Sequence, residues 1–144
     1  MGFLRDYPDI TREQLERTRG KMDGIGDCLV EGYEKLIPQM NLPDPKDNHV
    51  LAAAIRGRAD LIVTRNLKHF PPDVLAQYDL DVQHPDVFLT HLIDLYPAQF
   101  VSAVKEHRIS LKKRPKSPNE YLNLLKTQEL AQAVNELRPF IDVI

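Results

Sequence analysis

Hydrophobic and polar positions alternate with helical spacing along most of the chain, and two short segments interrupt that pattern. Residues 61–64 form a continuous apolar run, which is typical of a strand buried on both faces of a parallel sheet. Residues 80–82, Leu-Asp-Val, are interpreted as a second short strand. A helical pattern over residues 71–78 separates them. A strand, a helix and a second strand in this order predict a parallel pair joined by a right-handed crossover. The predicted fold class is therefore α/β, with a small parallel sheet flanked by many helices and a helical C-terminal half.

Helix-start and helix-end signals divide the helical pattern into segments. Thr11 with Gln14, and Ser117 with Glu120, form predicted capping boxes, and Gly57 is a typical residue just past a helix end. The predicted helices cover residues 11–22, 27–37, 47–56, 86–96 and 97–113, a segment that starts after residue 117, and 130–137.

Polar residues gather on both sides of the first apolar run. Asp44 and Asp47 lie in a proline-rich loop, while Thr64, Arg65 and Asn66 lie at the carboxyl end of the predicted strand. Ligands of open α/β sheets bind at that end of the strands, so this edge is the predicted active site. Asp47 has two interpretations from the sequence: a metal ligand, or a helix N-cap worth ~1 kcal/mol.

The motifs in this region occur in a recognisable order. They are Asp44-Pro45-Lys46-Asp47-Asn48-His49, Ala52-Ala53-Ala54, Ala59-Asp60, the apolar run, and Thr64-Arg65-Asn66. In this order they resemble the PIN domain family, the metal-dependent nucleases that include many toxin components of bacterial toxin–antitoxin pairs. The resemblance continues through His84-Pro85-Asp86-Val87-Phe88-Leu89 into the helical tail, and so covers most of the chain.

The resemblance implies a ribonuclease that hydrolyses phosphodiester bonds with Mg²⁺ or Mn²⁺ held by carboxylates. Asp47 and Asp44 are the predicted metal ligands. The predicted catalytic set is Asp47, Thr64 and Asn66, since the threonine and asparagine are suited to orienting water or substrate. The predicted phosphate-binding residues are Arg65, Lys112, Lys113 and Arg114. The last three belong to a basic stretch whose other interpretation is a solvated helix face followed by a linker.

The chain also departs from the family pattern. Family members begin with a strand that carries an acidic ligand, whereas residues 1–8 show no strand and lead directly into a helix. Asn66 stands where many members have aspartate, and His69 falls where an acid is common. We therefore expect an N-terminally truncated PIN-like domain that is inactive or incomplete as this chain alone. The alternative is a catalytically silent PIN-like module that serves binding or assembly.

Composition fits one domain with a single core. The chain has 144 residues, of which 42% are hydrophobic and 28% charged. The predicted single domain, 1–144, consists of a helical N-terminal part (1–40), an α/β active-site unit (41–83) and a helical C-terminal part (84–144). The five histidines and Cys28 show no zinc-ligand spacing. One cysteine also excludes an internal disulfide, which favours a cytoplasmic location, and no apolar run is long enough for a membrane helix.

The missing first strand leads to a prediction about assembly. Without it, the run at residues 61–64 has a pairing partner on one side only. An unpaired strand edge recruits another chain, so we expect a homodimer or a strand-exchanged oligomer. The further expected partners are an RNA substrate and an antitoxin protein.

Overall fold

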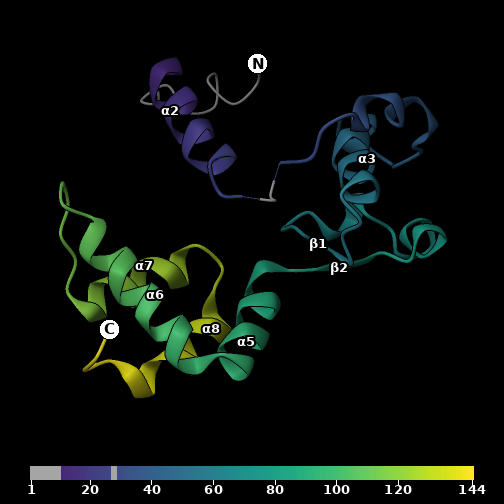
Figure 1. The fold of residues 1–144 in the computed structure, drawn as a ribbon. Coiled ribbons are helices and arrows are strands. Elements are labelled where there is room, and N and C mark those ends of the chain that lie inside the picture. The colour runs from purple at the N-terminus through teal and green to yellow at the C-terminus, as the bar shows by residue number, and fades with distance from the viewer. Residues whose placement is uncertain (1–10, 27–28) are drawn as a thin grey trace.

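The computed structural model describes residues 11–26 and 29–144 of the chain (Figure 1). Its helices are α2 (Arg12–Asp23), α3 (Asn48–Arg56), α4 (Pro72–Leu75), α5 (Pro85–Leu95), α6 (Pro97–Ser110), α7 (Pro118–Thr127) and α8 (Ala131–Leu137), and its strands are β1 (Leu61–Val63) and β2 (Asp81–Gln83). The predicted α/β fold with a small parallel sheet and many helices is confirmed. Residues 1–8, in which no strand was predicted, lie outside the described residues.

Helix α2 forms through local interactions. The predicted capping box is present, because the Thr11 hydroxyl accepts the Gln14 backbone N–H at 3.2 Å and the Gln14 side chain accepts the Thr11 N–H at 2.8 Å. No residue of α2 is buried. Figure 1 shows the helix apart from both groups of elements that follow it. Among the described residues, this helix is thus marked by its capping box and not by a buried face.

The helix predicted over residues 27–37 does not form in the part that the structure describes. From residue 29 onward there are two 3-10 turns, Tyr33–Lys35 and Ile37–Gln39. Gly32 precedes the first turn with a φ of 75°, a left-handed conformation that interrupts a helix. Pro38 has no N–H to continue the backbone bonding. The prediction is wrong because the apolar residues of these turns pack onto the neighbouring core without forming a continuous helix.

Helix α3 and the two strands build the first hydrophobic cluster. Leu51 and Ala52 of α3 are fully buried and pack in one cluster with Ile62 of β1. The helix ends at Gly57, as predicted. Strands β1 and β2 pair in parallel, with Ile62 opposite Val82. Helix α4 and two 3-10 turns, Leu67–His69 and Ala76–Tyr78, form the connection between the strands, so the predicted parallel pair joined through a helix is confirmed.

Strand β1 is less buried than its apolar sequence predicts. Ile62 is 6% exposed, but the next residue, Val63, is 41% exposed. The prediction of a strand buried on both faces is therefore wrong: an unbroken apolar run does not distinguish a covered face from an open one. Among the described residues β1 pairs with β2 alone, which leaves its other edge without a strand.

Because β1 has an open edge and Val63 is exposed, we still expect the chain to associate with a second copy of itself. We expect the chain to be a dimer at micromolar concentration, and Val63→Lys to weaken dimerisation at least about tenfold, or ~1.4 kcal/mol, because a charge would enter the contact. Light scattering over a dilution series measures this. Leu95→Lys, at a residue of α5 that is 68% exposed, is the matched control. A wild-type monomer at these concentrations would contradict the prediction.

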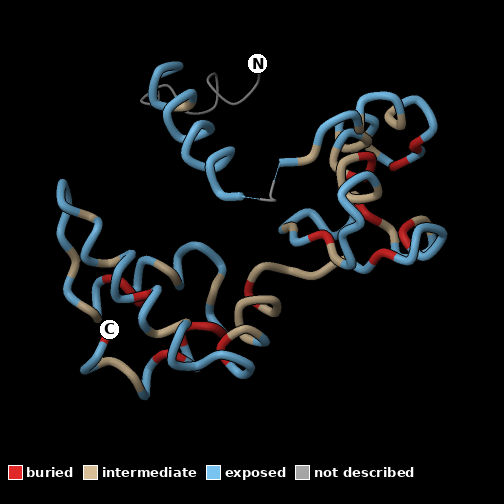
Figure 2. The backbone as a smooth tube through the Cα atoms, viewed as in Figure 1, coloured by how far each residue is buried: buried red, intermediate tan, exposed pale blue. Residues whose placement is uncertain are grey.

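Helices α5 to α8 build a second hydrophobic cluster. Its buried members are Ile93, Val104, Tyr121, Leu122, Ala133, Val134, Leu137 and Ile144. The expectation of a single core is wrong, since Figure 2 shows buried segments both around α3 and among α5 to α8. In the part of the chain that the structure describes, no helix combines the length and the apolar character needed to cross a membrane.

Two polar pairs order the helices of the second cluster. Ser117 and Glu120 form the predicted capping box of α7. Two hydrogen bonds to the Glu120 carboxylate lower its pKa, the larger effect coming from the Ser117 backbone N–H and the smaller from the Ser117 hydroxyl. Tyr121 is 3% exposed, and its hydroxyl lies 2.6 Å from Nδ1 of His107 on α6. Burial raises the pKa of the Tyr121 hydroxyl.

A buried carboxylate joins α5 to α8. Asp86 is 5% exposed, and its two oxygens accept the backbone N–H groups of Gln132 and Ala133 at 2.9 and 2.8 Å. These N–H groups belong to the first turn of α8, where no intrahelical acceptor exists. Asp86 therefore satisfies two orphan donors of one helix from the first turn of another.

Candidate metal centre

The acidic loop before α3 is fixed by its own side chains. Asp44 caps the 3-10 turn Pro45–Asp47, because its Oδ1 accepts the Lys46 N–H at 3.0 Å. The Asn48 side chain donates to the Met40 carbonyl at 3.1 Å and accepts the Leu42 N–H at 3.1 Å. The loop is therefore tied back to the core residues on its N-terminal side. This arrangement holds the next acid in a defined place.

Asp47 stands at the N-cap position of α3, yet its side chain makes no capping hydrogen bond. Its Oδ2 instead lies 2.8 Å from Nδ1 of His69. The interpretation of Asp47 as a simple helix cap therefore does not describe the structure. The carboxylate faces the segment that follows β1.

The turn after β1 places His69 beside Asp47. The Thr64 hydroxyl accepts the Asn66 N–H at 3.1 Å, and the Asn66 carbonyl accepts the His69 N–H at 2.9 Å. Behind His69, Phe70 is buried in the first cluster and anchors the end of the turn. Thr64 and Asn66 thus shape the turn that carries His69.

Three donor side chains converge here. Ligand atoms of Asp44, Asp47 and His69 all lie within 4.8 Å of one another. The side chains of His69 and Asp47 are 27% and 26% exposed, so the group is open to solvent on one side. Two carboxylates and one imidazole are a donor set that divalent ions use in proteins. The residues present therefore fit a divalent metal ion, with open positions left for water or substrate.

The predicted metal ligands and the predicted phosphate-binding residues differ in their placement. Asp44 and Asp47 are brought together as expected, and the structure adds His69, which sequence reasoning did not count as a ligand. The signal was present, since His69 occupies a position where the family often has an acid. Arg65 instead contacts the other half of the chain. Its guanidinium donates to the Gln128 carbonyl at 2.9 Å, and its Nε lies 3.6 Å from Oε2 of Glu129.

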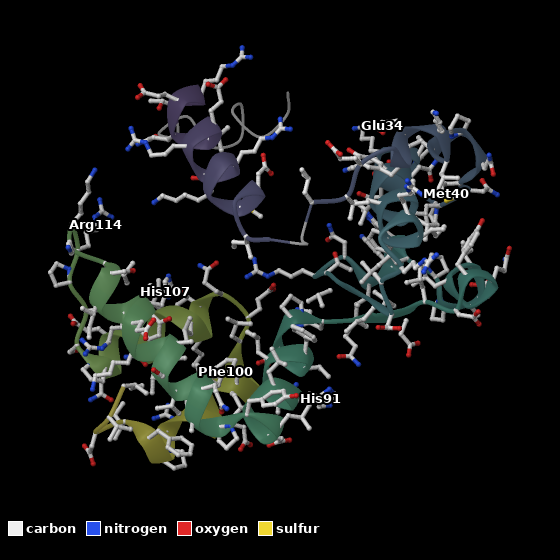
Figure 3. The ribbon with its side chains drawn as sticks, in the orientation of Figure 1. Glu34, Met40, His91, Phe100, His107 and Arg114 are labelled. Atoms are coloured by element: carbon white, nitrogen blue, oxygen red, sulfur yellow. The ribbon has the colours of Figure 1, made fainter. Side chains whose placement is uncertain are left out.

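The basic residues lie in the helical half. Lys112, Lys113 and Arg114 follow α6 and, together with Leu111 and Leu124, line an open groove of about 700 Å³. Figure 3 labels Arg114 on this half and Met40 on the other half, beside α3. Within the described residues, no hydrogen bond or ion pair joins the groove to the acidic group.

Comparison with known proteins identifies the families that two parts of the chain match. Residues 9–68 match the family described as PIN domain, and residues 85–139 match the family described as VapC50 C-terminal domain. A protein of Mycobacterium tuberculosis named "Putative ribonuclease VapC50" is 42% identical over 95 residues, which are 66% of this chain and 56% of that protein. The chain spans about half the length of this curated relative. No solved structure matches.

Residues 9–68 therefore belong to the PIN domain family, and residues 85–139 belong to the family described as VapC50 C-terminal domain. The first match ends at residue 68, before α4 and β2, and the second begins at residue 85, the first residue of α5. The two hydrophobic clusters also divide between β2 and α5. The acidic loop, Asp47 and the turn up to residue 68 lie within the first match, and His69 follows it directly. The second match covers the helices that carry the basic groove.

Proposed function

We propose that this chain acts as a metal-dependent ribonuclease and serves as the toxin of a toxin–antitoxin pair. The convergence of Asp44, Asp47 and His69 at the edge of the sheet is the observation that carries the proposal. The relative's name supplies the substrate class. An RNA phosphodiester is a hard, anionic substrate, and a divalent ion is suited to it.

Asp47, Asp44 and His69 would hold the ion, which we propose to be Mg²⁺ or Mn²⁺. When bound, such an ion lowers the pKa of a coordinated water and offsets charge on the phosphate. The chain's own residues keep the donors in place. Asn48 fixes the acidic loop from one side, and the turn from Thr64 to His69 fixes the imidazole from the other.

RNA binding is proposed to extend to the basic groove. Lys112, Lys113 and Arg114 can neutralise phosphates along a strand, while Leu111 and Leu124 give the groove an apolar floor. Arg65 is engaged with the Gln128 carbonyl, so a phosphate contact by Arg65 would require that bond to open. We further propose the cytoplasm as the site of action, and an antitoxin protein and a second copy of the chain as its partners.

Cleavage of single-stranded RNA by the 144-residue chain tests the proposal. From the sequence alone, two carboxylates are the predicted metal ligands, and little activity is expected. The structure adds His69 as a third donor, so we expect detectable cleavage with Mn²⁺. The measurement is product formation with Mn²⁺, with Mg²⁺ and with EDTA. Cleavage that persists in EDTA, or no cleavage with either ion at saturation, would contradict the proposal and favour a silent binding module.

The basic groove makes a separate prediction. Replacing Lys112, Lys113 and Arg114 with glutamine is expected to weaken RNA binding about tenfold or more at low salt, because three phosphate contacts are lost. The slope of log affinity against log salt should also become shallower. Fluorescence anisotropy with a labelled RNA measures both. Lys105→Gln, Lys21→Gln and Lys35→Gln combined form a control of equal charge change on exposed sites. Equal effects from the two triple variants would contradict a localised RNA contact.

A further inference from the structure

The donor set of the proposed site contains a nitrogen. Nδ1 of His69 lies 2.8 Å from Oδ2 of Asp47. Two neighbouring ligands at about 2.1 Å from an octahedral ion lie about 3 Å apart. The separation of these two atoms is therefore close to that of adjacent ligands on one ion.

The nitrogen matters because Mg²⁺ and first-row transition metals prefer different ligands. Mg²⁺ takes oxygen ligands in near-ideal octahedral geometry and keeps several of its waters. Imidazole nitrogen favours the transition metals, and affinity at nitrogen-containing sites rises along their series. Two carboxylates with open water positions still suit Mn²⁺, which accepts both oxygen and nitrogen donors. The oxygen and nitrogen donors together therefore favour Mn²⁺ over Mg²⁺.

We propose that His69 is the ion-selecting residue of this site and makes it prefer Mn²⁺ over Mg²⁺ through a direct metal–nitrogen bond. The inference rests on the proposed metal-dependent function and specifies which ion serves it. Asp47 and Asp44 supply the negative charge that both ions need, whereas His69 supplies the difference between them. The 27% exposure of the His69 side chain leaves it accessible to an incoming ion.

Metal binding to the protein without RNA tests the inference. Pulsed electron paramagnetic resonance of bound Mn²⁺ should show modulation from an imidazole nitrogen in the wild type. Calorimetry should show that His69→Asp lowers the ratio of Mn²⁺ to Mg²⁺ affinity by about tenfold, since an all-oxygen site no longer favours the transition metal. His49→Gln is the matched control, because His49 is exposed, lies two residues after Asp47 and bonds the Lys46 carbonyl.

The possible results of these measurements distinguish the role of His69 from the ribonuclease proposal. Nitrogen modulation that is present in wild type and His49→Gln, but absent in His69→Asp, supports the inference. Absence of modulation in the wild type, or an unchanged affinity ratio in His69→Asp, overturns it. If circular dichroism shows that His69→Asp does not fold, His69→Asn carries the same test with a neutral oxygen donor. Nitrogen-coordinated Mn²⁺ in a protein that cleaves no RNA would instead overturn the ribonuclease proposal and leave the ion preference standing.

Discussion

Asp47→Asn is expected to reduce Mn²⁺-dependent RNA cleavage by about 100-fold or more. The carboxylate is the central donor of the proposed site, because its Oδ2 lies 2.8 Å from His69 and it belongs to the same group as Asp44. An amide keeps the shape but removes the negative charge and one strong ligand oxygen. Initial rates of cleavage at saturating Mn²⁺ measure the effect.

The same variant is expected to fold normally. Asp47 makes no capping bond to α3, so the free energy of unfolding should change by less than about 1 kcal/mol. Asp73→Asn is the matched control, because Asp73 is an exposed acid in the first turn of α4. Full activity in Asp47→Asn, or an equal loss in Asp73→Asn, would show that Asp47 is not a ligand of the active ion.

Asp86→Ala is expected to lower the free energy of unfolding by about 3 kcal/mol or more. The substitution leaves the N–H groups of Gln132 and Ala133 without an acceptor, and the Ala133 bond is buried. Each hydrogen bond to a charged group contributes about 1.5–3 kcal/mol. Urea unfolding followed by circular dichroism gives the value. Asp94→Ala, at an exposed position of the same helix, should change stability by less than about 0.5 kcal/mol.

The shape of this unfolding curve also tests the domain organisation. We propose that residues 1–144 form one domain, supported by the contacts of Arg65 with Gln128 and Glu129, which connect the turn after β1 to the turn before α8. One transition that shifts as a whole in Asp86→Ala is the expected result. A separate early transition for α5 to α8 would show that the two hydrophobic clusters are independent folding units.

Elements with strong local signals could be predicted from the sequence. The capping boxes at Thr11 and Ser117 are formed by residues three positions apart, so the sequence contains the whole interaction. The order of strand, helix and strand likewise fixes the parallel pairing of β1 and β2. The helix starts at Pro97 and Pro118 follow from the fixed φ of proline and its missing N–H.

Features that depend on distant contacts could not be predicted. The bond between Asp47 and His69 joins residues 22 positions apart, and the bond between Arg65 and Gln128 joins residues 63 apart. No local spacing encodes either contact. The same reason explains Val63, whose exposure depends on which elements cover the sheet and not on its own apolar side chain. The division of the core into two clusters is a further property of the packing.

The candidate site was predicted in part. Asp44 and Asp47 followed from the resemblance and from their place before α3. Thr64 and Asn66 were expected to orient water or substrate, and in the structure they shape the turn that presents His69. The histidine itself was visible in the sequence as a departure from an acidic pattern. Its meaning depends on the distance to Asp47, which requires the three-dimensional structure.

Crystals of the protein grown with Mn²⁺ provide the most direct test of the metal centre. An anomalous difference map recorded at the manganese edge should show one strong peak within about 2.2 Å of an oxygen of Asp47, an oxygen of Asp44 and a nitrogen of His69. The peak should disappear in crystals of Asp47→Asn. No peak among these three side chains at saturating Mn²⁺, or a strong peak elsewhere in its place, would contradict the assignment of this group as the metal centre.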